Sequence, residues 1–128
     1  MPSQRELIFT IIKPGFLDKS QGIIELFAKS GWSVMMTSTK RLLPVQAREL
    51  YKVHKDKDFY QDLCEYMSSG QSMAIIFERP GRTNDSTFKE VQDIKDVVRK
   101  RWGIDDCKNV LHSSDSFSAM EHEMRIYF

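Results

Sequence analysis

The chain has 128 residues, enough for one compact domain with a hydrophobic core and too few for two domains of ordinary size. Its 19 basic and 18 acidic residues leave a formal net charge of +1, so no global field draws the protein to nucleic acid or to a membrane surface. Any anionic ligand must be held by a local cluster of donors, and the two cysteines, Cys64 and Cys107, have neither the spacing of a metal site nor that of a disulfide framework.

Targeting and membrane signals are not evident in this sequence. No apolar run near the N-terminus has the length of a secretory signal, and the longest apolar runs span only a few residues. We therefore expect one soluble, cytoplasmic domain over residues 1–128.

The first third of the chain predicts a strand, a helix and a second strand. Residues 7–12 are apolar and rich in β-branched side chains, and they stop at the turn formers of residues 13–15. Apolar side chains then recur at helical spacing between Ser20, a suitable N-cap, and Gly31, a suitable helix stop. Residues 32–42 alternate in polarity as a second strand does.

The middle of the chain predicts two helices and a third strand. Pro44 suits the first turn of one helix, and residues 59–67 form another, shorter one. Residues 72–77 are apolar and strand-like. Residues 79–85 are dense in turn formers and predict a loop.

The last third predicts a helix over residues 93–102, a short strand over 109–112, and a helix from about Ser116 in which Ser118 and Glu121 have capping-box spacing. The core order of the elements is βαββαβ, the ferredoxin-like α+β arrangement. We expect a four-stranded antiparallel sheet with helices packed on one face. This fold hosts many activities, so it does not decide the function.

Among the three histidines, only His112 has a context that suggests chemistry. His54 lies among lysines and His122 faces away from the apolar stripe of the last helix, so neither is assigned a role. His112 ends a strand and precedes small polar residues that lead into a helix, a place suited to an anionic ligand. Glu123 lies at the edge of that helix's apolar stripe. Its carboxylate either accepts a ring proton from His112 or is a solvated surface charge, and spacing alone favours the second.

Five ordered blocks of the sequence resemble the nucleoside diphosphate kinase family. The run N-V-L-H-S-S-D-S at residues 109–116 is similar to that family's active-site signature, N-x-x-H-G-S-D-S. The other blocks are I-I-K-P-G at 11–15 (family I-K-P-D-G), Tyr51 with residues 59–70 (family H-Y and F-F-x-x-L-x-x-Y-M-x-S-G), V-R before Trp102 (family T-I-R-x-x-F), and Glu123 with the ending I-Y-F at 126–128 (family S-A-x-x-E-I-x-x-W-F).

The resemblance implies an enzyme that transfers the γ-phosphate of ATP to a nucleoside diphosphate by a ping-pong exchange, through a phosphohistidine at His112. It implies Mg²⁺ held mainly by the nucleotide's phosphates. It also implies a homo-oligomer whose core unit is a dimer formed through a strand edge and a helix, with the tetramer and the hexamer both open.

The resemblance further implies a set of residues around His112. Glu123 would orient the imidazole ring, with Ser114 bonded nearby. The remaining roles are Lys13 on the sugar hydroxyl and the transferred phosphate, Tyr51 positioning Lys13 and that phosphate, Phe59 stacking on the base, Arg99 and Thr83 holding phosphates, and Asn109 binding the sugar.

Three departures from the family pattern stand out. The Lys13-Pro14-Gly15 turn is one residue shorter than the family's K-P-D-G. The segment between Glu78 and Arg99 is rebuilt, and the family's helix with a phosphate-binding arginine has no evident counterpart, so Arg82 is the candidate replacement. The chain stops at Phe128, before the tail that joins subunits in many members.

Two alternative functions remain open. The first is a nucleotide-binding regulatory module that kept the fold and lost efficient catalysis, which the rebuilt segment favours. The second is an RNA-binding ferredoxin-like domain, which predicts paired aromatics in a basic, glycine-containing strand. Residues 72–77 lack that pattern, so we expect no nucleic-acid partner.

Overall fold

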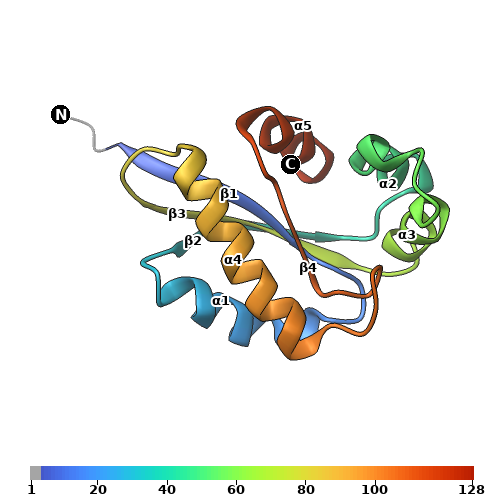
Figure 1. Ribbon diagram of the computed structural model, residues 1–128, viewed down its shortest axis with the longest axis horizontal. Helices are drawn as coiled ribbons and strands as arrows, with labels where there is room; N and C mark the ends of the chain where they lie inside the picture. Colours follow the sequence, from blue (N-terminus) through green and yellow to red (C-terminus); the bar gives the residue numbers. More distant parts are fainter. Residues whose placement is uncertain (1–3) are drawn as a thin grey trace.

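The computed structural model describes residues 4–128, in which one antiparallel sheet lies between two layers of helices (Figure 1). The strand order is β2-β3-β1-β4, and every neighbouring pair is antiparallel. The ferredoxin-like α+β fold predicted from the sequence is confirmed. The elements are β1 Arg5–Ile12, the 3₁₀ turn η1 Leu17–Lys19, α1 Ser20–Ala28, β2 Ser33–Lys40, α2 Pro44–Leu50, the 3₁₀ turn η2 Lys52–His54, α3 Tyr60–Met67, β3 Ser72–Pro80, α4 Asp85–Trp102, β4 Leu111–Ser113 and α5 Phe117–Tyr127.

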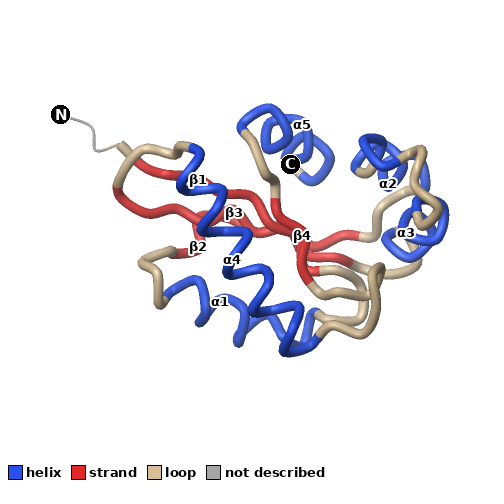
Figure 2. Tube along the Cα trace, viewed as in Figure 1, coloured by secondary structure: helices blue, strands red, loops and turns tan. Residues whose placement is uncertain are grey.

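The sheet is covered on both faces, which corrects the expectation of helices on one face. Figure 2 shows the strands passing between α1 and α4 on one side and α2, α3 and α5 on the other. In β1, Ile8 and Ile12 pack in the core beneath α1 and α4, whereas Phe9 and Ile11 pack in the core beneath the other helices. A strand buried on both faces is apolar at successive positions, and the run at residues 7–12 already has this character.

Helix α4 is much longer than the segment predicted for it, and it begins where a loop was expected. β3 continues to Pro80, and α4 starts at Asp85 instead of residue 93. Asn84 and Thr87 form a reciprocal capping box: the Asn84 side chain accepts from the Thr87 amide at 3.2 Å, and the Thr87 hydroxyl accepts from the Asn84 amide at 3.2 Å. The residues interpreted as turn formers are therefore the start signal of the helix.

The segment around β4 also differs from the prediction in detail. Val110 has φ +79°, so the strand begins two residues later than predicted, at Leu111. The N-cap of α5 is Ser116, whose hydroxyl accepts from the amide of Ala119 at 3.1 Å, and not the predicted pair of Ser118 and Glu121. No helix within residues 4–128 combines the length and the hydropathy that a membrane crossing needs.

Candidate functional site

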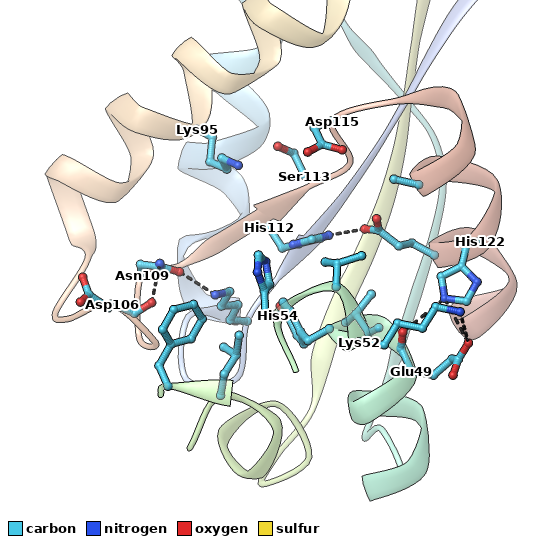
Figure 3. A pocket seen from close by; sticks show the side chains of 18 of the residues that line it. Glu49, Lys52, His54, Lys95, Asp106, Asn109, His112, Ser113, Asp115 and His122 are labelled. Carbon is cyan, nitrogen blue, oxygen red and sulfur yellow. Dashed lines mark hydrogen bonds and ion pairs between the residues drawn. The ribbon is translucent and has the colours of Figure 1, made fainter. Parts of the chain in front are cut away.

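The side chain of His112 is directed by the alternation of the short edge strand β4. Leu111 and Val110 are buried in the core beneath α1 and α4, and Ser113 is buried as well. His112, between them, points to the opposite face of the sheet, where it is partly buried beside α5 (Figure 3). β4 thus buries the side chains of Leu111 and Ser113 on one face of the sheet and presents the imidazole of His112 on the other.

Glu123 lies on the buried face of α5, between Met120 and Tyr127 at helical spacing, and not at its solvated edge. One of its carboxylate oxygens, Oε1, contacts Nε2 of His112 and also accepts a hydrogen bond from the Ser114 hydroxyl at 3.2 Å. A carboxylate can only accept from this ring, so Nε2 carries the proton and Nδ1 keeps a free lone pair. Burial lowers the pKa of His112, and Glu123 offsets this effect only in part, so the ring is neutral at pH 7.

Lys13 follows the last residue of β1 and is almost completely buried. Its amine donates to Oδ1 of Asn109 at 2.6 Å and to the carbonyl of Cys107 at 3.2 Å. Burial, reinforced by the charge of Arg99, lowers the pKa of Lys13 to about 7. Among residues 4–128 the amine is held by neutral acceptors and forms no ion pair, so an anion that entered the site would meet an uncompensated positive charge on Lys13.

Arg99 on α4 and Tyr51 after α2 complete the walls near His112. Two N–H groups of the Arg99 guanidinium donate to the carbonyl of Leu111, at 3.2 and 3.0 Å. The Tyr51 ring meets the His112 ring edge-on, with centroids 5.5 Å apart, and its ring centroid lies 5.9 Å from the Lys13 amine. Among residues 4–128, the buried Tyr51 hydroxyl has no hydrogen-bond partner. It is therefore a donor available to a ligand.

These side chains surround a cavity of about 520 Å³ that holds both charged and aromatic groups. At its mouth, the side chain of Phe59 is 38 % exposed. The ring centroid of His54 lies 5.7 Å from that of Phe59 and 6.4 Å from that of Tyr51. The cavity size is suited to a small ligand with one flat part and one anionic part. The predicted site residues that line it are Lys13, Tyr51, Phe59, Arg99, Asn109, His112 and Glu123.

Comparison with known proteins decides the family. The model of the family described as Nucleoside diphosphate kinase matches residues 6–128. The chain belongs to the nucleoside diphosphate kinase family. The resemblance of the sequence motifs to this family is thereby confirmed.

Relatives within the nucleoside diphosphate kinase family differ in how much of their length the chain spans. The human protein named Nucleoside diphosphate kinase homolog 5 is 34% identical over 133 residues, which are 96% of this chain but 62% of that protein. The nucleoside diphosphate kinase of Aquifex aeolicus is 29% identical over 143 residues, which cover all of this chain and 96% of the relative.

Solved structures of the nucleoside diphosphate kinase family share this fold. The crystal structure of the Aquifex aeolicus enzyme has a TM-score of 0.78 and 28% identity, and the match covers 98% of this chain and 96% of that one. The nucleoside diphosphate kinase of Encephalitozoon cuniculi has a TM-score of 0.82 at 18% identity, covering 96% of this chain and 88% of that one. At 18% identity, the similarity to the Encephalitozoon cuniculi protein shows a shared fold and nothing more.

Two residues predicted to hold phosphates are not brought to the cavity. The Thr83 hydroxyl accepts from the amide of Leu7 at 3.0 Å, and Arg82 donates to the side chain of Gln4 at 3.3 Å. Both precede the N-terminus of α4, whereas Arg99 is near its C-terminus, so the length of the helix separates them from His112. We therefore assign no phosphate contact to Arg82 or Thr83.

Three side chains that line the cavity were missed by sequence reasoning. Lys95 lies on α4, His54 stands beside Phe59, and His122 pairs with Glu49, with Nε2 at 3.2 Å from the Glu49 carbonyl and 3.4 Å from its carboxylate. The position of Lys95, one helical turn before Arg99 within the helix predicted over residues 93–102, is a usable signal. The histidines carry no such signal, because their placement depends on the packing of α2 and α5.

Proposed function

We propose that this protein is an active nucleoside diphosphate kinase that carries the transferred phosphate on Nδ1 of His112. The observation that carries the proposal is the buried, neutral imidazole whose Nε2 is paired with Glu123 and whose ring faces a cavity lined by cationic side chains. A neutral, oriented imidazole is a competent nucleophile, and a phosphoryl group needs positive charge around its oxygens.

In the first half-reaction, the Nδ1 lone pair of His112 forms a bond to the γ-phosphorus of a nucleoside triphosphate. The bond from that phosphorus to the β,γ-bridging oxygen breaks, and its electron pair leaves with the nucleoside diphosphate. The proton on Nε2 stays in its contact with Glu123, which stabilises the positive charge that develops on the ring. In the second half-reaction, a terminal oxygen of another nucleoside diphosphate attacks the same phosphorus, and the N–P bond breaks with its electron pair returning to Nδ1.

The other site residues serve to position the nucleotide. Lys13 supplies charge to the phosphate, and the free Tyr51 hydroxyl supplies a neutral donor. Phe59 at the mouth offers a face for stacking, which accepts any base because it reads no base edge. Asn109 holds Lys13 through its side-chain oxygen, and its amide nitrogen, which donates to the Asp106 carbonyl at 2.9 Å, keeps a second N–H for the sugar.

Mg²⁺ fits this site as an ion brought in on the nucleotide. Within residues 4–128, His, Cys, Asp and Glu form no group of three that could hold a metal, so its ligands would come mainly from the phosphates. When bound, Mg²⁺ would offset charge on the departing diphosphate. We further propose a cytoplasmic homo-oligomer built on a dimer.

Labelling with γ-³²P-ATP tests the proposal. The wild-type protein should become labelled with an acid-labile, alkali-stable phosphate, and a nucleoside diphosphate added afterwards should remove the label as nucleoside triphosphate. His112→Ala should take up no label, and Glu123→Gln should be labelled more slowly by on the order of 100-fold, because the ring loses its charged partner. His122→Ala, which alters a histidine of the same cavity outside the proposed chemistry, is the matched control.

A nucleotide-binding regulatory module is the second candidate function. It is favoured by the position of Arg82 and Thr83, since two expected phosphate contacts are missing from the cavity. This candidate predicts that wild-type protein binds nucleotides but stays unlabelled. Nucleotide binding without labelling would therefore overturn the kinase proposal and support the regulatory one.

A further inference from the structure

Two hydrogen bonds from the same face of α4 to β4 position Lys95 beside His112. Three residues before it, the Gln92 amide donates to the Ser113 hydroxyl at 3.2 Å. Four residues after it, the Arg99 guanidinium donates to the carbonyl of Leu111 at 3.0 Å. Residues three and four apart lie on one face of a helix, so Lys95 leaves α4 between the two strand residues that flank His112.

The amine of Lys95 makes no hydrogen bond to any of residues 4–128, unlike that of Lys13. It lies partly buried in the cavity wall, and Figure 3 shows its side chain over the strand near Ser113 and Asp115. The ion pairs formed among residues 4–128 do not include it. A partly buried cation without a close counter-charge is a costly feature of a fold, so an anionic ligand is the natural partner.

Burial and the charge of Arg99 oppose the charged form of Lys95 more strongly than the surrounding carboxylates favour it, and its pKa falls to about 8. Its own helix supplies Arg99 and Asp96, the segment after β4 supplies Asp115, and α5 supplies Glu123. Glu123 is already engaged by His112 and Ser114. The charge of Lys95 is felt by the imidazole, where it favours the neutral form of the ring.

We propose that Lys95 is a catalytic residue that binds the phosphoryl group while it moves to and from Nδ1 of His112. This inference rests on the proposed kinase function and names a residue for it. Lys13 would approach the group from the end of β1 and Lys95 from α4, so that two amines neutralise its oxygens from two elements of the fold. The rebuilt helix thus supplies the cation that Arg82, at the far end of α4, does not.

The experiment compares Lys95→Met, Lys95→Arg and Lys100→Met with the wild-type protein in single-turnover labelling by γ-³²P-ATP. Lys100 lies on the same helix with its side chain exposed, so Lys100→Met controls for the loss of a lysine from α4. Lys95→Met should label about 100-fold more slowly, because one preorganised cation on the transferring group is removed. Lys95→Arg should recover part of the loss, and Lys100→Met should match the wild type.

Equal labelling rates of Lys95→Met and Lys100→Met would overturn the assignment. So would a loss in Lys95→Met that Lys95→Arg does not relieve while both variants keep the wild-type melting temperature. If the wild-type protein takes up no label, the kinase proposal is wrong, and the catalytic role of Lys95 that depends on it is wrong too. In a labelled wild type, only the Lys95 assignment is at stake.

Discussion

At the scale of single residues, the site depends on keeping the basic groups of Lys13, Lys95, Arg99 and His112 close together without a carboxylate for each. Burial opposes the charged form of His112 and of Lys13, and for both it is the strongest influence on the pKa. For His112 the outcome is a neutral nucleophile. For Lys13 it is an amine that, with a pKa of about 7, changes its charge near physiological pH. The binding of an anion and of a proton are therefore linked at Lys13.

Nucleotide binding should take up protons at alkaline pH. At pH 8, one unit above the pKa of Lys13, only about one free molecule in ten carries the proton. A bound phosphate favours the charged amine and raises its pKa, so binding of a nucleoside diphosphate protonates Lys13. Isothermal titration calorimetry in buffers of different ionisation enthalpy measures this uptake. It should be roughly 0.9 proton smaller in Lys13→Arg, whose guanidinium is charged before and after binding.

A second pH provides the internal check. At pH 6 the free Lys13 is already protonated, so the wild type and Lys13→Arg should differ little in proton uptake. Any contribution from the phosphates of the nucleotide cancels between the two proteins. The linkage is refuted if their uptake is equal at pH 8, or if their difference grows as the pH falls.

At the scale of elements, α4 joins two separate tasks. Its N-terminal half, capped by Asn84, packs Phe88 and Val91 into the protein, and its C-terminal half presents Lys95 and Arg99 to the cavity. The contacts of Gln92 and Arg99 with β4 fix the helix beside the strand that carries His112. The cap should therefore matter for stability and little for the chemistry.

Asn84→Ala should destabilise the fold by about 1 kcal/mol, because the amide of Thr87 loses its side-chain acceptor at the start of the helix. Urea denaturation followed by circular dichroism measures the free energy of unfolding. Ser86→Ala, at an exposed position of the same first turn, is the control and should stay within about 0.5 kcal/mol of the wild type. The labelling rate of folded Asn84→Ala should equal that of the wild type, and a rate loss as large as that of Lys95→Met would disprove the separation of tasks.

At the scale of the whole molecule, local patterns predicted the strands and the active-site strand-to-helix segment, but not the neighbours of that segment. The pairing of His112 with Glu123 was predicted from the family resemblance, because the eleven-residue spacing alone favoured a solvated Glu123. The N-terminal half of α4 was missed because Asn84 reads equally well as a turn residue and as a helix cap. Lys95 lay within the predicted helix and was missed because the contacts of Gln92 and Arg99 with β4, which bring it to the cavity, are not encoded in sequence spacing. His54 and His122 reach the cavity through the docking of α2 and α5, a long-range contact that sequence spacing does not encode.

The edge strand β2 is the feature of the whole molecule that calls for a partner. β2 pairs with β3 and has no strand on its other side within residues 4–128. The side chains of Val34, Met35 and Met36 are 40%, 49% and 45% exposed. An open edge with consecutive exposed apolar side chains invites pairing with another strand, and soluble proteins usually cover or charge such edges. A second copy of the same strand, related by a two-fold axis, is the simplest cover, which is the dimer that we propose.

The charge variant Met35→Lys tests this arrangement. Two lysines brought together across a two-fold contact repel each other, so Met35→Lys should shift the protein from its oligomer toward a monomer at micromolar concentration. Light scattering coupled to size-exclusion chromatography measures the mass, with Val45→Lys as the control, because Val45 is a comparably exposed apolar residue on α2. Unchanged circular dichroism would show that the monomer keeps its fold. A wild-type protein that is already monomeric would contradict a β2 interface. An oligomer that Met35→Lys leaves intact would contradict it too, because a dimer through β2 would have to bury two like charges side by side.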